Sequence, residues 1–427
     1  MKTFSIISLG CHKNLIDSEY ICEQLIQAGY KHLSDESQAD TIVVNTCAFL
    51  NSAVEESIQT MLECIEEGKE VICAGCLVSR YREELLAELP EIRLFAGPGT
   101  YANISVALEK DQAYLAPVFD TVVSRSFCST GSVAYLKISE GCSNRCNYCL
   151  IPTLRGELIS KPMNIVLTEC RGLVERGARE IILVGQDLGS YGRDAGISYG
   201  LETLIEQIST IEDIAWIRVM YVHPFSLNPE LIEMISSNPK VCPYIDLPIQ
   251  HVSEKVLRAM GRRGGASAIR KAFDLLGHHE DIWVRSTVMV GHPGEDQESF
   301  EELRSFISEG HIEHLGVFGF SSEPGTPSYA MQKKVDNQTI EFRRNCIMSI
   351  QQEISRKKLE SLIGKTIQVL VEDYHPDTEL LLKARASFQA PDVDGMVIIN
   401  QGNAIFGNFY PVEIRETLEY DLIGRII

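Results

Sequence analysis

The chain has 427 residues, 44% of them hydrophobic and 23% charged, which is the composition of an ordinary soluble protein of two or three domains. No apolar run approaches the roughly 18 to 20 residues needed to span a bilayer, and the N-terminal stretch is too short for a signal peptide, so we expect a cytoplasmic protein with no membrane partner. The formal net charge of −20 disfavours a protein that mainly binds the phosphate backbone of nucleic acids and favours a basic partner, although it does not exclude a local basic patch.

Residues 1–125 form the first expected domain, an alternation of short apolar runs and amphipathic helices. This βαβαβ order predicts a doubly wound parallel sheet, so the fold class is α/β. The apolar periodicity places strands at 3–9, 41–45 and 70–74 and helices at 17–29 and 54–67.

Thirteen cysteines in a reduced compartment indicate ligation of a metal or cluster rather than disulfides. Cys11, Cys47 and Cys76, the strand-end cysteines, each follow one of the expected strands. Because ligands gather at the carboxyl ends of such strands, we expect these three thiols to converge on one cluster. A buried small hydrophobe is the alternative for a free cysteine, and we favour it for the cysteines inside helices and strands, such as Cys73. Cys73 and Cys76 also form a C-x-x-C pair, so a redox dithiol or an exchange of ligands stays open.

Residues 130–360 form the second expected domain, in which six strands alternate with helices. Six βα repeats predict a partial (βα)6 barrel rather than the closed eight-fold barrel. The expected strands are 133–139, 180–185, 216–221, 244–247, 283–290 and 314–320, and the expected helices are 164–175, 201–209, 230–236, 266–276 and 298–308.

Cys142, Cys146 and Cys149, the loop cysteines, follow the first of these strands in the pattern C-x-x-x-C-x-x-C. Three thiolates bind three irons of a [4Fe–4S] cube and leave the fourth iron open to an outside ligand. The amino and carboxylate groups of S-adenosylmethionine suit that open iron, so the spacing predicts a radical-generating site. A zinc site is the alternative, but zinc usually takes four ligands, and no fourth cysteine or histidine lies close by in sequence.

Polar residues and glycines cluster at the ends of the other expected strands or within them. A cofactor with an amino acid end, a ribose and an adenine needs such carboxylates, amides and glycines. Taken singly, each is more often a turn residue or a satisfied polar group in the core, and His251 and His292 are weak evidence for metal binding. The residues that we predict to contact S-adenosylmethionine are Gly185, Gln186, Arg218, Gln250, Arg285, Gly291 and Glu295.

Residues 364–427 form the third expected domain, a small antiparallel β-barrel of the OB-like kind that follows a polar helix over 338–362. Its expected strands are 366–372, 380–383, 396–400 and 410–415. From Lys365 onward ten acidic residues stand against five basic ones. An acidic barrel binds phosphate poorly and is a better dock for a basic protein.

Four stretches, GCHKNLIDSE, VVNTCAFL, AGCLVSRY and GCSNRCNYCLIPTLRG, resemble in this order the methylthiotransferase family of radical S-adenosylmethionine enzymes, and the resemblance covers essentially the whole chain. It implies that the loop cysteines hold the radical cluster, that the strand-end cysteines hold a second [4Fe–4S] cluster, and that Tyr148 flanks the adenine. It also implies that the C-terminal barrel is a TRAM domain, a module that often binds RNA. The departures are small, with Lys161 where arginine is usual and His292 where an apolar residue is common, and neither is at a ligand position.

The stretch APDVDG at 390–395 resembles the branch of the family that modifies a small-subunit ribosomal protein, protein twelve, rather than the branches that modify transfer RNA. The implied reaction begins when a 5′-deoxyadenosyl radical removes a hydrogen from the β-carbon of an aspartate, and a methylthio group is then attached there. The implied partners are a basic ribosomal protein, an electron donor such as flavodoxin or ferredoxin and a sulfur source, and we expect a monomer. The alternatives are the same chemistry on an adenosine of transfer RNA and a non-catalytic iron–sulfur electron carrier or sensor.

Overall fold

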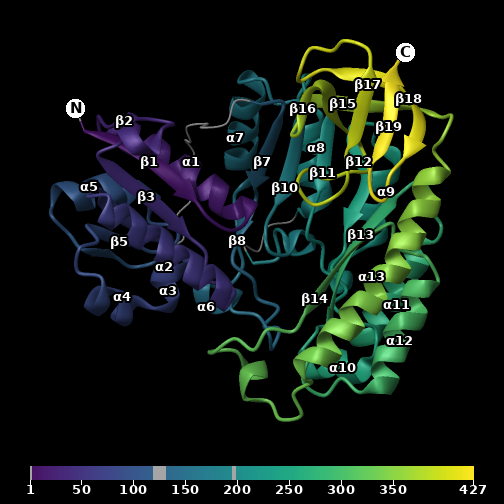
Figure 1. Cartoon of the computed structure of the whole chain (residues 1–427), viewed down its shortest axis with the longest axis horizontal. Helices are drawn as coiled ribbons and strands as arrows, with labels where there is room; N and C mark the ends of the chain where they lie inside the picture. The colour runs from purple at the N-terminus through teal and green to yellow at the C-terminus, as the bar shows by residue number, and fades with distance from the viewer. Residues whose placement is uncertain (1, 119–130, 195–198) are drawn as a thin grey trace.

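A computed structural model describes residues 2–118, 131–194 and 199–427 of the chain. The predicted boundary between the first two domains, at 125–130, lies outside these residues. Figure 1 shows an N-terminal domain on one side of a central sheet, a long helix along the other side, and a small barrel at the end of that helix. Within the described residues, no helix is both long enough and apolar enough to cross a membrane.

The N-terminal domain is a six-stranded parallel sheet in the order β2-β1-β3-β4-β5-β6. The three predicted strands and both predicted helices are confirmed. Helix α1 begins at His12 rather than at residue 17. Its first turn carries the buried polar residues Lys13 and Asn14, which an apolar pattern does not reveal. The strands are β1 Thr3–Ser8, β2 Lys31–His32, β3 Thr41–Thr46, β4 Glu70–Gly75, β5 Leu94–Ala96 and β6 Tyr114–Leu115, and the helices are α1 His12–Gln27, α2 Asn51–Glu66, α3 Cys76–Arg80, α4 Arg82–Glu88 and α5 Ile104–Glu109, with 3-10 turns η1 Glu36–Gln38 and η2 Tyr101–Asn103.

The central domain is an open sheet of six parallel strands in the order β14-β13-β12-β11-β10-β7, as expected for a partial barrel. Its strands are β7 Val133–Lys137, β10 Glu180–Val184, β11 Trp216–Val219, β12 Val241–Asp246, β13 Trp283–Val290 and β14 His314–Gly319, and a short antiparallel pair adds β8 Ser139–Glu140 and β9 Ile159–Ser160. The helices are α6 Ile151–Arg155, α7 Met163–Glu175, α8 Leu201–Ser209, α9 Pro229–Ser237, α10 Glu254–Ala259, α11 Gly265–Leu276 and α12 Gln297–Ser308, with 3-10 turns η3 Leu188–Ser190, η4 Pro224–Ser226 and η5 Pro327–Ala330.

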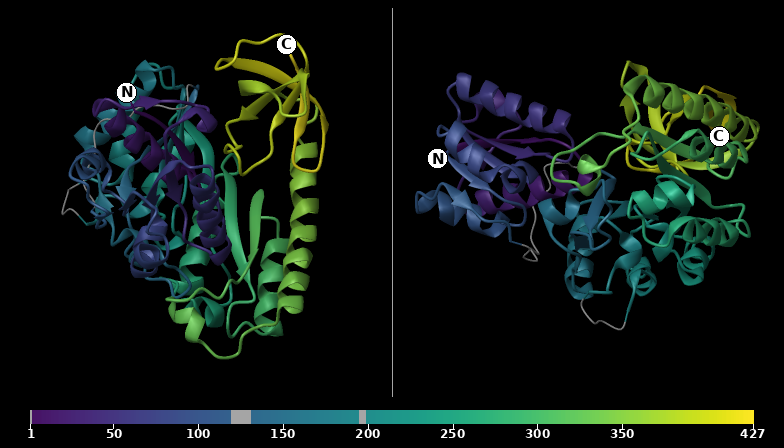
Figure 2. Two further views of the ribbon diagram at one scale, coloured as in Figure 1. Left: turned by 60° about the vertical axis from the view of Figure 1, so that its left-hand side comes forward. Right: turned by 90° about the horizontal axis from the view of Figure 1, so that it is seen from below.

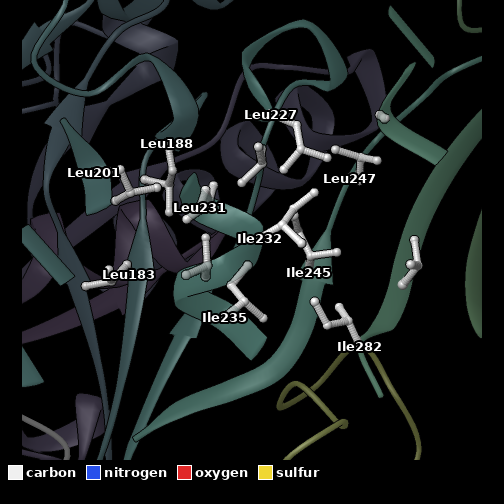
Figure 3. Close-up of a cluster of buried hydrophobic side chains, with 14 of the residues drawn as sticks. Leu183, Leu188, Leu201, Leu227, Leu231, Ile232, Ile235, Ile245, Leu247 and Ile282 are labelled. Atoms are coloured by element: carbon white, nitrogen blue, oxygen red, sulfur yellow. The ribbon is translucent and has the colours of Figure 1, made fainter. Parts of the chain in front are cut away.

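The core of the central domain lies between this sheet and the helices that cover its outer face (Figure 3). Leu183 of β10 and Ile245 of β12 are fully buried there, as is Leu231 of α9. Each such side chain stabilises the fold by about 1.5 to 3 kcal/mol relative to an exposed one. The packed outer face leaves the concave face and the carboxyl ends of the strands for function.

Helix α13, Asn337–Glu360, runs from the central domain to the C-terminal barrel, as the left view of Figure 2 shows. The carboxylate of Asp336 accepts a hydrogen bond from the backbone N–H of Thr339 (2.9 Å) and so begins the helix. The barrel is closed in the order β15-β16-β17-β19-β18. Its strands are β15 Thr366–His375, β16 Thr378–Ala386, β17 Val397–Gln401, β18 Phe409–Thr417 and β19 Leu422–Ile426.

The fifth strand of the C-terminal barrel, β19, is absent from the four strands that we predicted. It is a short run at the end of the chain, and it becomes a strand by pairing in parallel with β17 and antiparallel with β18. β18 ends only four residues before β19, but β17 lies further back in the sequence, and a local pattern does not reveal the parallel pairing with it.

Candidate active site

The loop cysteines lie in a segment that is held by backbone hydrogen bonds on both sides. The N–H of Cys142 donates to the carbonyl of Gly156 (3.0 Å), and the N–H of Asn147 donates to the carbonyl of Met260 (2.8 Å). Gly141 has a φ of +70°, and a Cβ there would lie 2.1 Å from the carbonyl oxygen of Glu157. The loop therefore requires glycine at its entry and is fixed before any ligand binds.

The three loop cysteines line one cavity of about 170 Å³ at the carboxyl end of the central sheet. Three of the other residues that we predicted also line it, namely Tyr148, Gln186 and Gln250. The structure thus brings together segments from three different strand ends. The prediction missed several further lining residues, because histidines, asparagines and arginines in loops carry no periodic signal; the polar ones are Asn144, Tyr221, His223 and Arg262.

The walls of this cavity carry polar groups that the protein itself does not satisfy. Among the described residues, the buried Nε2 of Gln186, Nε2 of His223 and Nε of Arg262 have no hydrogen-bond partner. Burial, followed by the nearby charge of Arg262, lowers the pKa of His223 to about 3, so its ring is neutral at pH 7. Buried polar groups are normally hydrogen-bonded, so these three groups fit a polar ligand such as S-adenosylmethionine.

The donor chemistry of the loop also fits an iron–sulfur cluster. All cysteines of the described residues are free thiols. Burial raises the pKa of the Cys142 thiol, and it raises the pKa of the Cys149 thiol to about 12, so these are poor nucleophiles until a metal removes the proton. Within the described residues, no three cysteine, histidine or acidic side chains are close enough to hold a single metal ion. In a [4Fe–4S] cube each thiolate binds a different iron, which suits a wider spacing than one ion requires.

Neither of the two arginines that we predicted to contact the cofactor lines this cavity. The Nε of Arg218 donates to a carboxylate oxygen of Glu180 (2.7 Å), and its Nη1 donates to the carbonyl of Ser387 in the C-terminal barrel (2.6 Å). The Nη1 of Arg285 donates to the carboxylate of Asp394 in the same barrel (2.6 Å). Arg218 is the third of four residues in β11 and Arg285 the third of eight in β13, and both side chains are directed to the barrel instead of the cavity. The sequence pattern identified their strands but not the domain that their side chains contact.

Three further predicted residues support the loops around the cavity rather than line it. The carbonyl of Gly185 accepts a hydrogen bond from Nζ of Lys13 (3.3 Å). Gly291 has a φ of +82°, and a Cβ there would lie 2.3 Å from Cγ1 of Ile340. The carboxylate of Glu295 accepts the N–H of Gly291 and pairs with Arg343 at 3.0 Å. Both residues thus hold the turn after β13 against α13.

The strand-end cysteines, which are far apart in the sequence, lie together at the carboxyl ends of β1, β3 and β4. Cys11 is exposed, Cys47 half-buried and Cys76 buried. Burial, with a smaller contribution from the neighbouring Cys47 and Cys11, raises the pKa of the Cys76 thiol to about 11, although the charge of Arg155 opposes this. For Cys11, loss of hydration at the thiol is outweighed by the charges of Lys13 and Arg155, which lower its pKa, although the residue as a whole keeps exposed surface. The three thiols therefore share one electrostatic environment.

Arg155, the last residue of α6, connects the two groups of cysteines. Helix α6 follows Cys149 directly in the sequence and packs against α3, which begins at Cys76. The Arg155 side chain is buried, and its Nη1 donates to the carboxylates of Asp17 on α1 (3.0 Å) and of Glu140 (3.1 Å). One short helix therefore fixes the N-terminal domain against the loop cysteines.

Cys73 does not behave as one half of a redox dithiol with Cys76. It is fully buried in β4, and burial raises the pKa of its thiol to about 12. A thiol of this kind is rarely deprotonated and has no access to a partner disulfide. The geometry favours the alternative of a small core residue.

Sequence profiles of three families match the chain in order. They are the uncharacterized protein family UPF0004 over residues 3–97, the radical SAM superfamily over 136–307 and the TRAM domain over 363–427. A radical SAM domain implies a [4Fe–4S] cluster and S-adenosylmethionine as cofactors.

The chain is similar over its whole length to curated proteins called ribosomal protein uS12 methylthiotransferase RimO. The one from Geobacter sulfurreducens is 43% identical and covers 99% of this chain and 98% of its own. The one from Citrifermentans bemidjiense is 42% identical with the same coverage of 99% and 98%. Among solved structures, the radical S-adenosylmethionine methyltransferase TsrM from Kitasatospora setae, with cobalamin and a [4Fe–4S] cluster bound, aligns with a TM-score of 0.59 over 77% of this chain and 74% of its own. At 13% identity this last similarity concerns the fold alone.

Proposed function

Because the chain belongs to the RimO family of ribosomal protein uS12 methylthiotransferases, we propose that it adds a methylthio group to the β-carbon of an aspartate in uS12. The observation that carries this proposal is the pairing of two cysteine trios across one domain contact. One trio lines a polar cavity in the central domain, and the other lies at the strand ends of the N-terminal domain. An electron carrier has no need of such a cavity.

The loop cysteines would hold the radical cluster, and the unsatisfied polar groups of Gln186, His223 and Arg262 would receive the polar parts of S-adenosylmethionine. When bound, these two cofactors supply radical chemistry, which breaks an unactivated C–H bond that acid–base catalysis cannot break. Tyr148 and Gln250 complete the cavity wall. Enclosure by these side chains keeps water and free thiols from the reacting carbon.

The strand-end cysteines would hold a second [4Fe–4S] cluster, which takes part in the delivery of sulfur. If the two sites are independent, anaerobic reconstitution should load about eight irons per chain, four for each cube. Replacement of all three loop cysteines by alanine should leave about half of this iron. The Cys47→Ala variant should also keep about half, should still cleave S-adenosylmethionine and should fail to deliver sulfur. A folded triple variant without any cluster would contradict the independence of the sites.

A basic ribosomal protein would dock on the acidic C-terminal barrel, and an electron donor such as flavodoxin or ferredoxin and a sulfur source complete the reaction. Asp373, Asp377 and Glu379 are exposed in and around the β15–β16 hairpin. We expect the double variant Asp377→Lys/Glu379→Lys to weaken uS12 binding. The effect should be larger at low salt, because salt screens attraction between exposed charges beyond the Debye length, which is only about 8 Å at physiological ionic strength. The same charge change at exposed Asp274 and Glu280 is the matched control. Equal effects of both pairs would argue against docking on the barrel.

The cellular test compares ribosomal proteins and transfer RNA, by mass spectrometry, from cells that lack this chain and from cells complemented with it. We expect the methylthio group on uS12 to disappear and to return with the wild-type chain but not with the triple loop-cysteine variant. A methylthio group that is lost from an adenosine of transfer RNA, with uS12 unchanged, would replace the protein substrate by the RNA substrate.

A further inference from the structure

Lys13 is a buried cation that lies between the two cysteine trios. It is only 8% exposed, and it follows Cys11 by two residues in the first turn of α1. Its side chain leaves the N-terminal domain and reaches the central domain. There Nζ donates to the carbonyl of Gly185 (3.3 Å) and lies 3.9 Å from the centre of the Tyr221 ring.

These contacts place the ammonium group at the wall of the cavity that holds the loop cysteines. Tyr221 lines that cavity, as does Gln186, which directly follows Gly185. Lys13 is thus in contact with the radical site while belonging to the loop of the second site. A target carbon that must react at both sites has to lie between them, which is where Lys13 lies.

Lys13 differs from the other buried lysines in the charges around it. Lys137 pairs with Asp17 and, at 2.7 Å, with Glu140, and Lys161 pairs with Glu169 at 2.8 Å. No carboxylate of the described part of the chain lies within ion-pair distance of Lys13; its hydrogen bond to Gly185 is long, and only the Tyr221 ring adds to it. A buried cation normally has an anionic partner, because the loss of hydration is costly otherwise.

Asp246, an acid of the central sheet on which the charge of Lys13 acts, does not serve as that partner. Burial raises the pKa of Asp246 to about 6, and the charges of Arg285 and Lys13 oppose this only in part. The carboxylate of Asp246 is directed instead to the N–H of Tyr221 (3.2 Å). The ammonium group of Lys13 therefore keeps donors for an external anion, since it has three and uses one.

On the basis of the function proposed above, we propose that Nζ of Lys13 binds the carboxylate of the target aspartate. The carboxyl carbon is bonded directly to the β-carbon, so a residue that binds the carboxylate also fixes the position of the reacting carbon next to it. A charge-assisted hydrogen bond of this kind also distinguishes aspartate from asparagine. Lys13 is then a substrate-binding residue that determines specificity.

The rival role for Lys13 is a countercharge for a cluster on the strand-end cysteines, because its charge also acts on Cys11. Arg155 already supplies a buried positive charge to the same thiols. The two roles predict different effects of a neutral side chain at position 13. Loss of a countercharge would lower the iron content, whereas loss of a carboxylate anchor would remove the preference for an aspartate substrate.

The test uses the cluster-loaded full chain, the Lys13→Met variant and a fluorescent peptide of the target loop of uS12, made once with aspartate and once with asparagine at the target position. Binding is measured by anisotropy with S-adenosylmethionine present and no reductant. The wild type should bind the aspartate peptide about tenfold to a hundredfold more tightly than the asparagine peptide. Lys13→Met should bind both alike with its iron content unchanged, and Lys31→Met, at an exposed lysine of the same domain, should keep the preference.

An aspartate preference that persists in Lys13→Met would overturn the assignment, and so would loss of iron from that variant, which would favour the countercharge. Mass spectrometry of the wild-type reaction separates this outcome from failure of the proposed function. If the wild type modifies the aspartate peptide, only the role of Lys13 is at issue. If the wild type binds the peptide and modifies neither it nor uS12, the proposed function and the role of Lys13 fail together.

Discussion

At the scale of single residues, the second cysteine site depends on the absence of a side chain at position 10. Gly10 has a φ of +87°, and a Cβ there would lie 2.7 Å from Cβ and 3.0 Å from Sγ of Cys47. The glycine lets the loop that carries Cys11 approach the loop that carries Cys47. Two thiols that are 36 positions apart in sequence thereby reach the same point.

We expect Gly10→Ala to displace the thiol of Cys47 and to lower the iron content after reconstitution by about half, four of eight irons, while the radical cluster is kept. The measurement is iron per chain together with the electron paramagnetic resonance spectrum of the reduced protein. Gly68→Ala is the matched control, because Gly68 also has a positive φ, +76°, but a Cβ there would have no neighbour within 4 Å. Equal iron loss in both variants would mean that backbone strain, not the approach to Cys47, is responsible.

At the scale of elements, both edges of the open central sheet hold the N-terminal domain. Beside β7, helix α6 contributes the buried Arg155. After β14, the carboxylate of Glu323 accepts the N–H of Asn51, the first residue of α2 (3.1 Å), and pairs with Arg80, the last residue of α3 (3.1 Å). Since α2 follows Cys47 and α3 begins at Cys76, Glu323 braces two of the three strand-end cysteines.

We expect Glu323→Ala to lower the free energy of unfolding by about 3 to 5 kcal/mol, because it leaves Arg80 buried without its countercharge. The side chains of this pair are only 7% and 3% exposed. Urea denaturation under anaerobic conditions measures the change. Glu301→Ala, which breaks the surface pair with Arg304 on α12, should cost less than about 1 kcal/mol. A similar small cost at both positions would contradict the bracing role of Glu323.

At the scale of the whole molecule, the C-terminal barrel is packed against the beginnings of strands β10, β11 and β13 of the central sheet. The rings of Trp283 and Phe388 are stacked with centroids 4.0 Å apart, and those of Trp216 and Phe409 meet edge to face at 4.7 Å. Arg385 of the barrel pairs with Glu180, which also pairs with Arg218 of β11. These buried aromatic and charged contacts join the two domains into one unit.

The contact also changes the interpretation of the stretch APDVDG. The side chain of Asp394 is only 1% exposed and pairs with Arg285 at 2.6 Å, so its charge serves the domain contact and not an external partner. Asp392 lies 3.5 Å from His12 of the N-terminal domain, and its side chain is 65% exposed. The acidic excess of the barrel is therefore smaller on its surface than the sequence count suggests, and the docking proposed above would rest mainly on the exposed acids around the β15–β16 hairpin.

We expect the barrel and the central domain to unfold in one cooperative transition, because their hydrophobic core is continuous. Phe388→Ala should destabilise both together by about 3 to 5 kcal/mol. Tryptophan fluorescence is a direct probe, since the chain has only two tryptophans and both contact the barrel. Two separate thermal transitions, with the tryptophans reporting only the first, would contradict a single unit. Phe342→Ala, at a ring that is 66% exposed, is the matched control.

The sequence by itself determined the class of the fold, the order of the domains and both cysteine trios. These features are local, since strand and helix periodicity is read within a few residues and cysteine spacing reports a loop. Tertiary structure alone decided the rest. It assigned Gln186 and Gln250 to the cavity and Arg218 and Arg285 to the barrel contact, and it added His223 and Arg262. It also placed Lys13 between the two sites. The domain that packs against a given strand residue depends on contacts between distant segments, which no local pattern records.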